Sequence, residues 1–279
     1  MIKTILVPIC HKEDINQNLD FAVQLANKFD AHIKVLHVIA PIELVVGTVP
    51  MELGWVPMES GYSLEAYKQF QKSAEEQAEK YRKICEKKLS NKSVRFDWCL
   101  EKGDLLKYLY TYSRTSDVSV ISQKGNEFTE VFDVMNDFII GSGLPVIVVP
   151  KTEAGNFRLN NILVAWDGSR ECANATRDAL PFLKIADKVV VATITEEYKT
   201  HLPEADICVH LSRHDVNVEA LTLSDSTPPE RRIIDTAESI DADMIVAGAW
   251  GHRRLTEFVF GGVTSELLNN QRWPIFLAH

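Results

Sequence analysis

The sequence lacks a long apolar run, an excess of positive charge and any pairing of its cysteines. No apolar stretch approaches the ~20 residues of a transmembrane helix, so we expect no membrane span. The formal net charge is −9, which argues against a nucleic-acid partner because neutralising phosphates requires a basic surface. The sequence therefore favours a protein that acts on neither membranes nor nucleic acids.

The cysteines are odd in number, scattered and without a C-x-x-C pair: Cys10, Cys85, Cys99, Cys172 and Cys208. This usage predicts reduced, mostly buried thiols and no zinc site. Cys10 precedes His11, but neighbouring residues at a strand end point to opposite sides, which argues against a shared metal. The chain also enters an apolar segment at Lys3 without a charged leader, so we expect a cytoplasmic protein.

An internal repeat organises the chain. Residues 3–10 and 160–167 are similar apolar runs, typical of parallel strands covered on both faces. Helix-like segments follow at 14–29 and 170–184, and in the first of them Leu19, Ala22, Leu25 and Phe29 recur at helical spacing. Further strands are expected at 33–39, 94–100, 118–122 and 144–149, and at 189–195, 216–223, 244–247 and 273–278.

Strands and helices that alternate at this pace predict an α/β fold with two doubly wound, mainly parallel sheets and helices on both faces. The length of 279 residues suits two domains. We place the first at residues 1–150, a polar linker at 151–160 and the second at 161–279. The apolar content of 46% is sufficient for two cores.

A glycine-rich stretch follows the fourth strand of the second domain. Gly248 and Gly251 are spaced Gly-x-x-Gly, and nine residues separate Gly251 from Gly261. Such glycines are either turn punctuation or a backbone cradle, since a helix that opens behind them directs free N–H groups at an anion. This stretch is our candidate phosphate site.

The spacing of Gly248, Gly251 and Gly261 resembles the motif of the universal stress protein family, Gly, two residues, Gly, nine residues, Gly, then Ser or Thr. Gly262 departs from it, because the hydroxyl is missing although the backbone N–H remains. The resemblance covers both halves. It implies a five-stranded sheet in each domain and a tandem pair that imitates the family's dimer, with 146–149 and 275–278 as the interdomain seam.

The resemblance also implies a binding site for ATP or a related adenine nucleotide in the second domain. It assigns Asp167 to the ribose and the backbone of Ile194 to adenine, although Asp167 or Ser169 could instead cap the next helix. The phosphates, with Mg²⁺ held mainly by phosphate oxygens and water, would bind the backbone of the glycine turns. The residues expected there are Gly248, Gly251, Gly261, Gly262, Val263 and Thr264, and Arg253 is either a phosphate ligand or a solvated loop residue.

The first domain departs from this pattern. Cys10-His11-Lys12 stands where the second domain has Asp167-Gly168-Ser169, Ser122-Gln123-Lys124-Gly125 loses the first glycine, and Met135-Asn136 replaces the later pair. Side chains there would occupy the space of a phosphate. We expect that the first domain has lost nucleotide binding.

The first domain also carries an apolar insertion at residues 41–63 that the second lacks. Apolar loops are rarely bare in water, so it is expected to cover its own cleft, the partner domain, a second copy in a homodimer or another protein, or to hold a hydrophobic ligand. After it, Tyr67, Phe70, Ala74, Ala78, Tyr81 and Cys85 form the apolar stripe of a long helix.

The primary functional hypothesis is a stress-response protein that binds an adenine nucleotide in its second domain and uses occupancy as a switch. No catalytic residue is predicted, and the absence of an evident general base implies at most a slow ATPase. The alternative is a nucleotide-independent interaction or scaffold protein, or a hydrophobic-ligand binder, that uses residues 41–63. An adenylating enzyme is disfavoured because neither domain has a Ser-Gly-Gly-x-Asp-Ser loop after its first strand.

Overall fold

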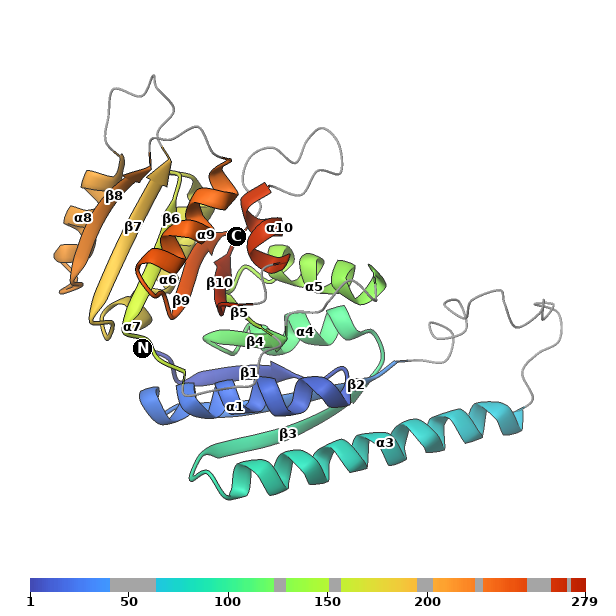
Figure 1. Cartoon of the computed structure of the whole chain (residues 1–279). Helices are drawn as coiled ribbons and strands as arrows, with labels where there is room; N and C mark the ends of the chain where they lie inside the picture. The colour runs from blue at the N-terminus through green and yellow to red at the C-terminus, as the bar shows by residue number, and fades with distance from the viewer. Residues whose placement is uncertain are drawn as a thin grey trace.

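The strands form one ten-stranded sheet in the order β3-β2-β1-β4-β5-β10-β9-β6-β7-β8 (Figure 1). This computed structural model describes residues 1–40, 64–122, 129–150, 157–194, 203–223, 228–249, 262–269 and 272–279. The strands are β1 Thr4–Pro8, β2 His32–Ile39, β3 Arg95–Lys102, β4 Val118–Ser122, β5 Val146–Val149, β6 Asn161–Trp166, β7 Lys188–Ile194, β8 Val218–Leu223, β9 Met244–Gly248 and β10 Ile275–Ala278. The insertion at 41–63 lies outside the described residues.

The two halves of the sheet repeat one topology. Read from the outer edge to the middle, the order is β3-β2-β1-β4-β5 in the first half and β8-β7-β6-β9-β10 in the second. Within each half the paired strands are parallel. The α/β fold with five strands in each half, expected from the repeat and the resemblance, is confirmed.

The halves join where β5 and β10 pair antiparallel, with Phe276 opposite Ile147. The seam is therefore the one that the resemblance implied. The strands on both sides of it are fully buried, as their continuous apolar sequences predict. The domain bounds at 150 and 161 stay a prediction.

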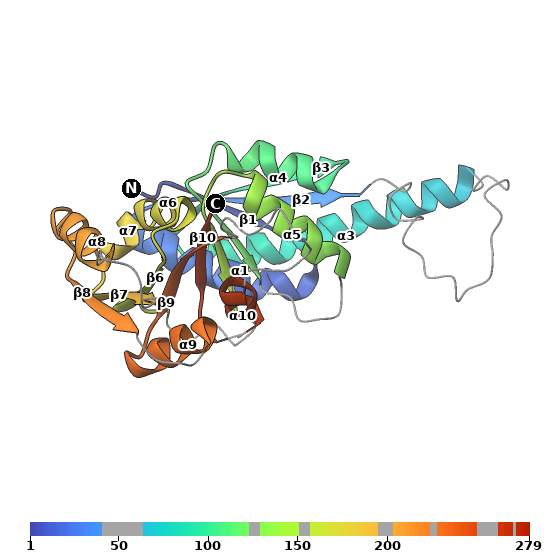
Figure 2. The same ribbon diagram turned by 90° about the horizontal axis from the view of Figure 1, so that it is seen from above.

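Helices cover both faces of the sheet (Figure 2). Their bounds are α1 Lys12–Phe29, α3 Leu64–Ser90, α4 Leu105–Ser113, α5 Thr129–Gly141, α6 Arg170–Asp178, α7 Leu180–Leu183, α8 Pro203–Ser212, α9 Pro229–Ser239 and α10 Gly262–Asn269. One core cluster contains residues of α1, α3, α6, α7 and α8, and the other contains residues of α4, α5, α9 and α10. The sheet separates the two clusters.

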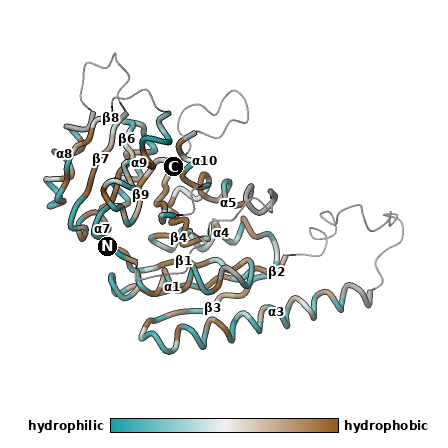
Figure 3. Tube along the Cα trace, viewed as in Figure 1, coloured by the Kyte–Doolittle hydropathy of each residue, from teal (hydrophilic) through white to brown (hydrophobic). Residues whose placement is uncertain are grey.

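The predicted stripe of α1 packs on the core, and so does the carboxyl-terminal part of the predicted stripe of α3. In α1, Leu19, Ala22 and Leu25 are buried and Phe29 packs against the same core. In α3, Ala78 and Tyr81 are buried, while the helix alternates between hydrophobic and hydrophilic residues (Figure 3). The amino-terminal part of α3 extends beyond the sheet in both ribbon views (Figures 1 and 2).

The single helix expected over residues 170–184 is wrong. The chain forms α6 and then the short α7, and Ala179 is both the C-cap of α6 and the N-cap of α7. Pro181 lies at the start of α7 and has no backbone N–H to continue the hydrogen bonds of α6. The helix therefore ends and restarts.

The last residues of the predicted linker pack on the first half. The Phe157 ring lies 4.3 Å from the Phe21 ring of α1, measured between centroids, and the Phe157 N–H donates to Gln24 Oε1 at 2.6 Å. Leu159 is buried in the same core cluster. The end of the predicted linker is thus in contact with α1.

Candidate functional site

The candidate site lies at the carboxyl ends of β6, β7 and β9. β6 pairs with β7 on one side and with β9 on the other, so the chain reverses the direction in which it adds strands at β6. In open α/β sheets such a topological switch point separates the loops on the two sides and leaves space for a ligand. The predicted Asp167 and Gly248 come from the two strands that flank this point.

A tight turn links β6 to α6. The Ser169 hydroxyl accepts a hydrogen bond from the Cys172 N–H at 3.1 Å and caps the helix. Asp167 Oδ1 accepts from the Ser169 N–H at 2.8 Å, and Gly168 has φ of +73°, which glycine adopts readily. Of the two roles weighed for this turn, Ser169 performs the capping, and the Asp167 side chain is exposed.

Gly248 lets β9 approach the start of α6. A Cβ at this position would lie 2.7 Å from the Cys172 backbone nitrogen and 2.9 Å from the Glu171 carbonyl carbon. Both are main-chain atoms, so no side chain can move aside to make room. The structure therefore provides a packing reason for this glycine: it brings the strand end and the helix amino terminus together.

The first turn of α10 adjoins the same strand end. Thr264 is buried, and its hydroxyl donates to the Gly248 carbonyl at 3.3 Å. Gly262, Val263 and Thr264 form the first turn, where backbone N–H groups have no partner within the helix. The start of α6, the end of β9 and the start of α10 are thus contiguous.

Several predicted ligands fall outside the described residues. These are Gly251, Arg253 and Gly261. Ile194 is the last residue of β7, opposite Leu223 of β8, so its backbone lies at the expected end of the strand. The structure therefore brings together Asp167, Gly248 and Thr264, and it leaves the other assignments as predictions.

Sequence reasoning missed two polar groups at this edge. Trp166 Nε1 and Thr193 Oγ1 are buried and have no hydrogen-bond partner among the residues that the structure describes. The two residues are neighbours in the pairing of β6 with β7. Buried polar atoms usually have partners, so a pair without them is a feature that a bound group or water could satisfy. The sequence did not indicate a polar role for either residue, because each is a single residue in an apolar run that predicts a buried strand.

Two further groups are buried at the start of α6. Glu171 is 2% exposed, and its Oε1 accepts from Arg170 Nη2 at 2.9 Å. Burial, with a smaller contribution from the Asp167 carboxylate, raises the pKa of the Cys172 thiol to about 12. The thiol donates to the Ala165 carbonyl at 2.7 Å, so it is a protonated, inert packing group.

The equivalent edge of the first half has side chains where the second has glycine. Ser122 ends β4 as Gly248 ends β9, because each lies opposite the last residue of the final strand, Val149 or Ala278. Asn18 of α1 donates to the Ser122 hydroxyl at 3.4 Å. These contacts agree with the expectation that the first half lacks the cradle, while 123–128 lie outside the described residues.

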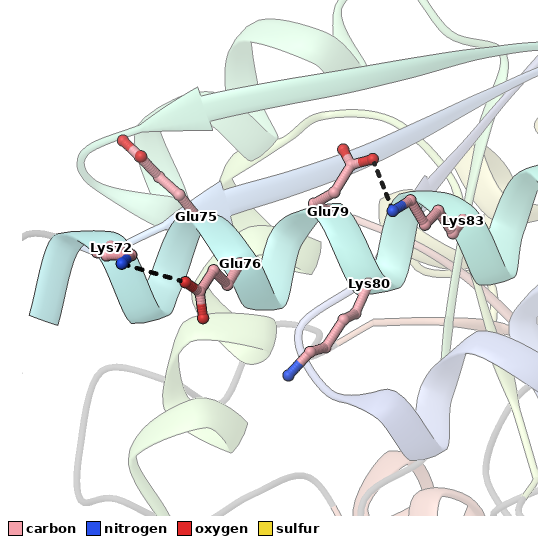
Figure 4. A pocket seen from close by; sticks show the side chains of 6 residues that line it. All are labelled: Lys72, Glu75, Glu76, Glu79, Lys80 and Lys83. Atoms are coloured by element: carbon pink, nitrogen blue, oxygen red, sulfur yellow. Dashed lines mark ion pairs between the residues drawn. The ribbon is translucent and has the colours of Figure 1, made fainter. Parts of the chain in front are cut away.

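A separate hollow of about 480 Å³ lies on α3, far along the chain from these strand ends (Figure 4). Its described lining has equal numbers of basic and acidic residues: Lys72, Glu75, Glu76, Glu79, Lys80 and Lys83. Lys72 pairs with Glu76 at 4.0 Å and Lys83 with Glu79 at 3.6 Å. Because acidic and basic groups neutralise one another there, the hollow has no net preference for an anion.

The described residues contain neither a membrane-spanning helix nor a cluster of metal ligands. No helix among them is both long enough and apolar enough to cross the bilayer, and they contain no group of three or more His, Cys, Asp or Glu side chains arranged to hold a metal. Of the cysteines, Cys85 and Cys172 are buried and Cys10, Cys99 and Cys208 are half-buried.

Comparison with known families identifies the part of the chain that contains β9 and α10. Residues 204–279 match the model of the Universal stress protein family. That region supplies the glycine stretch and the last strand of the universal stress protein fold. No curated protein matches the chain.

Solved structures extend the fold to the whole chain. A universal stress protein from Archaeoglobus fulgidus DSM 4304 aligns with a TM-score of 0.71 at 15% identity, covering 99% of this chain and 95% of that one. A putative universal stress protein from Pseudomonas aeruginosa UCBPP-PA14 aligns with a TM-score of 0.60 at 13% identity, covering 99% and 93%. A universal stress protein family protein from Arabidopsis thaliana, solved with AMP bound, covers 43% of this chain and 90% of its own at a TM-score of 0.33 and 14% identity. At these identities the first two matches establish the universal stress protein fold over both halves.

Proposed function

We propose that the second half binds ATP or a related adenine nucleotide and that occupancy acts as a switch in a stress response. The observation that carries the proposal is the meeting of three segments at the switch point of the sheet. The turn at Asp167, the end of β9 at Gly248 and the first turn of α10 at Thr264 are contiguous. The match of residues 204–279 to the Universal stress protein family supports it.

Each segment offers a different kind of contact. The exposed Asp167 carboxylate is suited to accept hydrogen bonds from ribose hydroxyls. The first turn of α10 presents free N–H groups and the positive end of the helix dipole, which suit phosphate oxygens. The unpartnered Trp166 Nε1 and Thr193 Oγ1 are polar groups at this edge that the described part of the protein does not satisfy.

Mg²⁺ would bind mainly through phosphate oxygens and water, because no described group of three acidic or histidine side chains could hold it. Gly251, Gly261 and Arg253 would complete the phosphate contacts. The role of this chain's residues is to bind and orient the nucleotide rather than to activate water. Because the glycine stretch between β9 and α10 contacts the phosphates in this proposal, it is also the segment that would report occupancy.

The test is calorimetric titration of ATP with Mg²⁺ into the nucleotide-stripped full chain, with Asp167→Ala and Cys10→Ala as matched variants. Cys10 is the counterpart of Asp167 in the first half. Ile5 of β1 lies opposite the first residue of β4, as Ile162 of β6 lies opposite the first residue of β9, and Cys10 and Asp167 each follow five residues later. We expect one site per chain, an affinity at least about tenfold weaker in Asp167→Ala because a charge-assisted hydrogen bond is lost, and no change in Cys10→Ala.

Two results would refute the proposal. One is the absence of both binding heat and thermal stabilisation by ATP in folded, stripped protein. The other is equal binding by Asp167→Ala and the wild-type chain, which would place the ligand elsewhere. Either would favour the nucleotide-independent interaction protein, with residues 41–63 as the surface to examine.

A further inference from the structure

Two histidines meet at the end of α8, on the outer edge of the second half. His210 lies in the last turn of the helix, and His214 lies in the turn that follows. Their ring centroids are 4.8 Å apart and the ring planes are inclined by 67°. The spacing is His-x-x-x-His, which places two side chains on one side of a helix in successive turns.

This separation is that of a chelating pair. An imidazole nitrogen binds a transition metal at about 2.0–2.1 Å. Two imidazoles bound to one ion at an angle of about 90–110° then have ring centroids about 4.5–5.2 Å apart. The observed 4.8 Å falls inside this range, so chelation needs only rotation of the rings and no movement of the backbone.

The ring nitrogens are available. Neither ring takes a hydrogen bond or an ion pair within the part of the chain that the structure describes, and the His210 side chain is exposed while His214 is half-buried. The turn itself is held by the backbone, since the His214 N–H donates to the Leu211 carbonyl at 2.9 Å. The helix is anchored to the sheet by Ile207 and Leu211, which are buried in the core.

The protein supplies two ligands here and no third from the described residues. Asp215, the nearest acid beyond His214, faces Lys184 at 3.7 Å, and Asp206 is a full turn before His210. No described group of three or more ligating side chains exists. Water would therefore complete the coordination of a bound ion.

We propose that His210 and His214 form a binding site for a divalent transition-metal ion of the Zn²⁺, Ni²⁺ and Cu²⁺ class. Neutral imidazole suits these ions, whereas Mg²⁺ and Ca²⁺ prefer oxygen ligands. A bound ion would connect two successive turns and stabilise the end of α8 against the edge of the sheet. The site is independent of the nucleotide proposal, because it lies on a different element and uses different residues.

The experiment is titration of ZnCl₂, and separately NiCl₂, into the full chain expressed without a polyhistidine tag and freed of metal by chelation. Binding is followed by calorimetry and by the shift of the melting temperature. We compare the wild type with His210→Gln, His214→Gln and the double variant Ser212→His/His214→Gln. The double variant keeps two histidines but places them on opposite sides of the helix, because residues two apart are about 200° apart.

We expect saturable binding of one ion per chain at this site in the wild type and loss of that ion and of its thermal shift in all three variants. Melting temperatures in EDTA that match the wild type show that the variants fold. Protons compete with metal for imidazole, so affinity should fall on acidification. The proposal is overturned if the wild type binds neither ion, or if the double variant binds as the wild type does, which would assign binding to scattered cysteines or histidines elsewhere.

Discussion

Gly248 occupies a position where a single methyl group would meet the main chain. Its added Cβ would lie 2.7 Å from the Cys172 nitrogen, so α6 would have to move away from β9. We expect Gly248→Ala to lower the free energy of unfolding by about 1–3 kcal/mol, the usual cost of overpacking a core. Urea unfolding measures this loss.

The control for that variant is Gly143→Asn. Gly143 has positive φ, but nothing lies within 4 Å of the position that a Cβ would take there, and asparagine tolerates this backbone conformation. Its stability should be close to the wild type. If Gly248→Ala were equally stable, the close approach of β9 to α6 would not constrain this residue.

His37 is a buried histidine whose protonation opposes folding. Desolvation lowers the pKa of its ring, and the hydrogen bond that Nδ1 donates to the Ile9 carbonyl at 2.8 Å only partly offsets this effect. The ring packs edge-on against Tyr81 and is stacked near Trp98. The neutral ring is thus the form that the core accommodates.

This lowered pKa predicts a loss of stability in acid. The unfolded chain takes up the proton near pH 6.5 and the folded chain only at lower pH, so stability falls as pH drops below about 6.5. In His37→Asn, whose amide nitrogen takes the place of Nδ1 and can donate to Ile9, the decrease in unfolding free energy between pH 7.5 and pH 5.5 should be smaller than in the wild type. Equal decreases in urea titrations would exclude His37 as a source of the acid sensitivity.

At the scale of elements, Ser169 caps α6. The structure assigns its hydroxyl to the Cys172 N–H rather than to a ligand. Ser169→Ala should therefore cost about 1 kcal/mol of stability, as the loss of a helix cap usually does, and should affect ATP binding less than Asp167→Ala does.

Asp104→Ala is the matched variant in the first half, because Asp104 caps α4 by accepting from the Lys107 N–H at 2.6 Å. Urea unfolding should give both variants losses of similar size. If Ser169→Ala kept its stability but bound ATP more weakly, Ser169 would contact the nucleotide and would not stabilise the start of α6.

Most elements could be predicted because their signals are local. The strand at 118–122 has the bounds that its apolar run indicated. The broken helix at Ala179 could not be placed from apolar spacing alone, since the same face continues through Phe182 into the core. The missing N–H of Pro181 decided it, and a backbone effect of that kind does not alter hydrophobic periodicity.

On the scale of the whole molecule, aromatic rings pack across the two halves. Phe276 of β10 is fully buried with its ring centroid 5.5 Å from that of Phe182, which in turn lies 5.1 Å from Phe29 of α1. Phe276→Ala should lower the unfolding free energy by about 3–5 kcal/mol because it leaves a cavity at the seam.

Hydrogen exchange tests whether the seam couples the halves. One continuous sheet predicts that amides of β1 and of β6 lose protection together in Phe276→Ala, although the substitution lies in the second half. Phe276→Leu, which keeps most of the volume, should show a smaller loss in both strands. Reduced protection confined to β6, β7 and β9 would instead show that the halves open independently.

The sequence by itself determined the strands, the apolar helix faces and the repeat, because burial of one face imposes a local period on the chain. The seam could be anticipated only through the resemblance to a family. Tertiary structure alone decided that Gly248 touches the start of α6, that Thr264 bonds to Gly248, and that Trp166 and Thr193 are buried without partners among the described residues. Gly248 and Cys172 are far apart along the chain, and no local pattern records which distant backbone atoms will meet once the sheet is assembled.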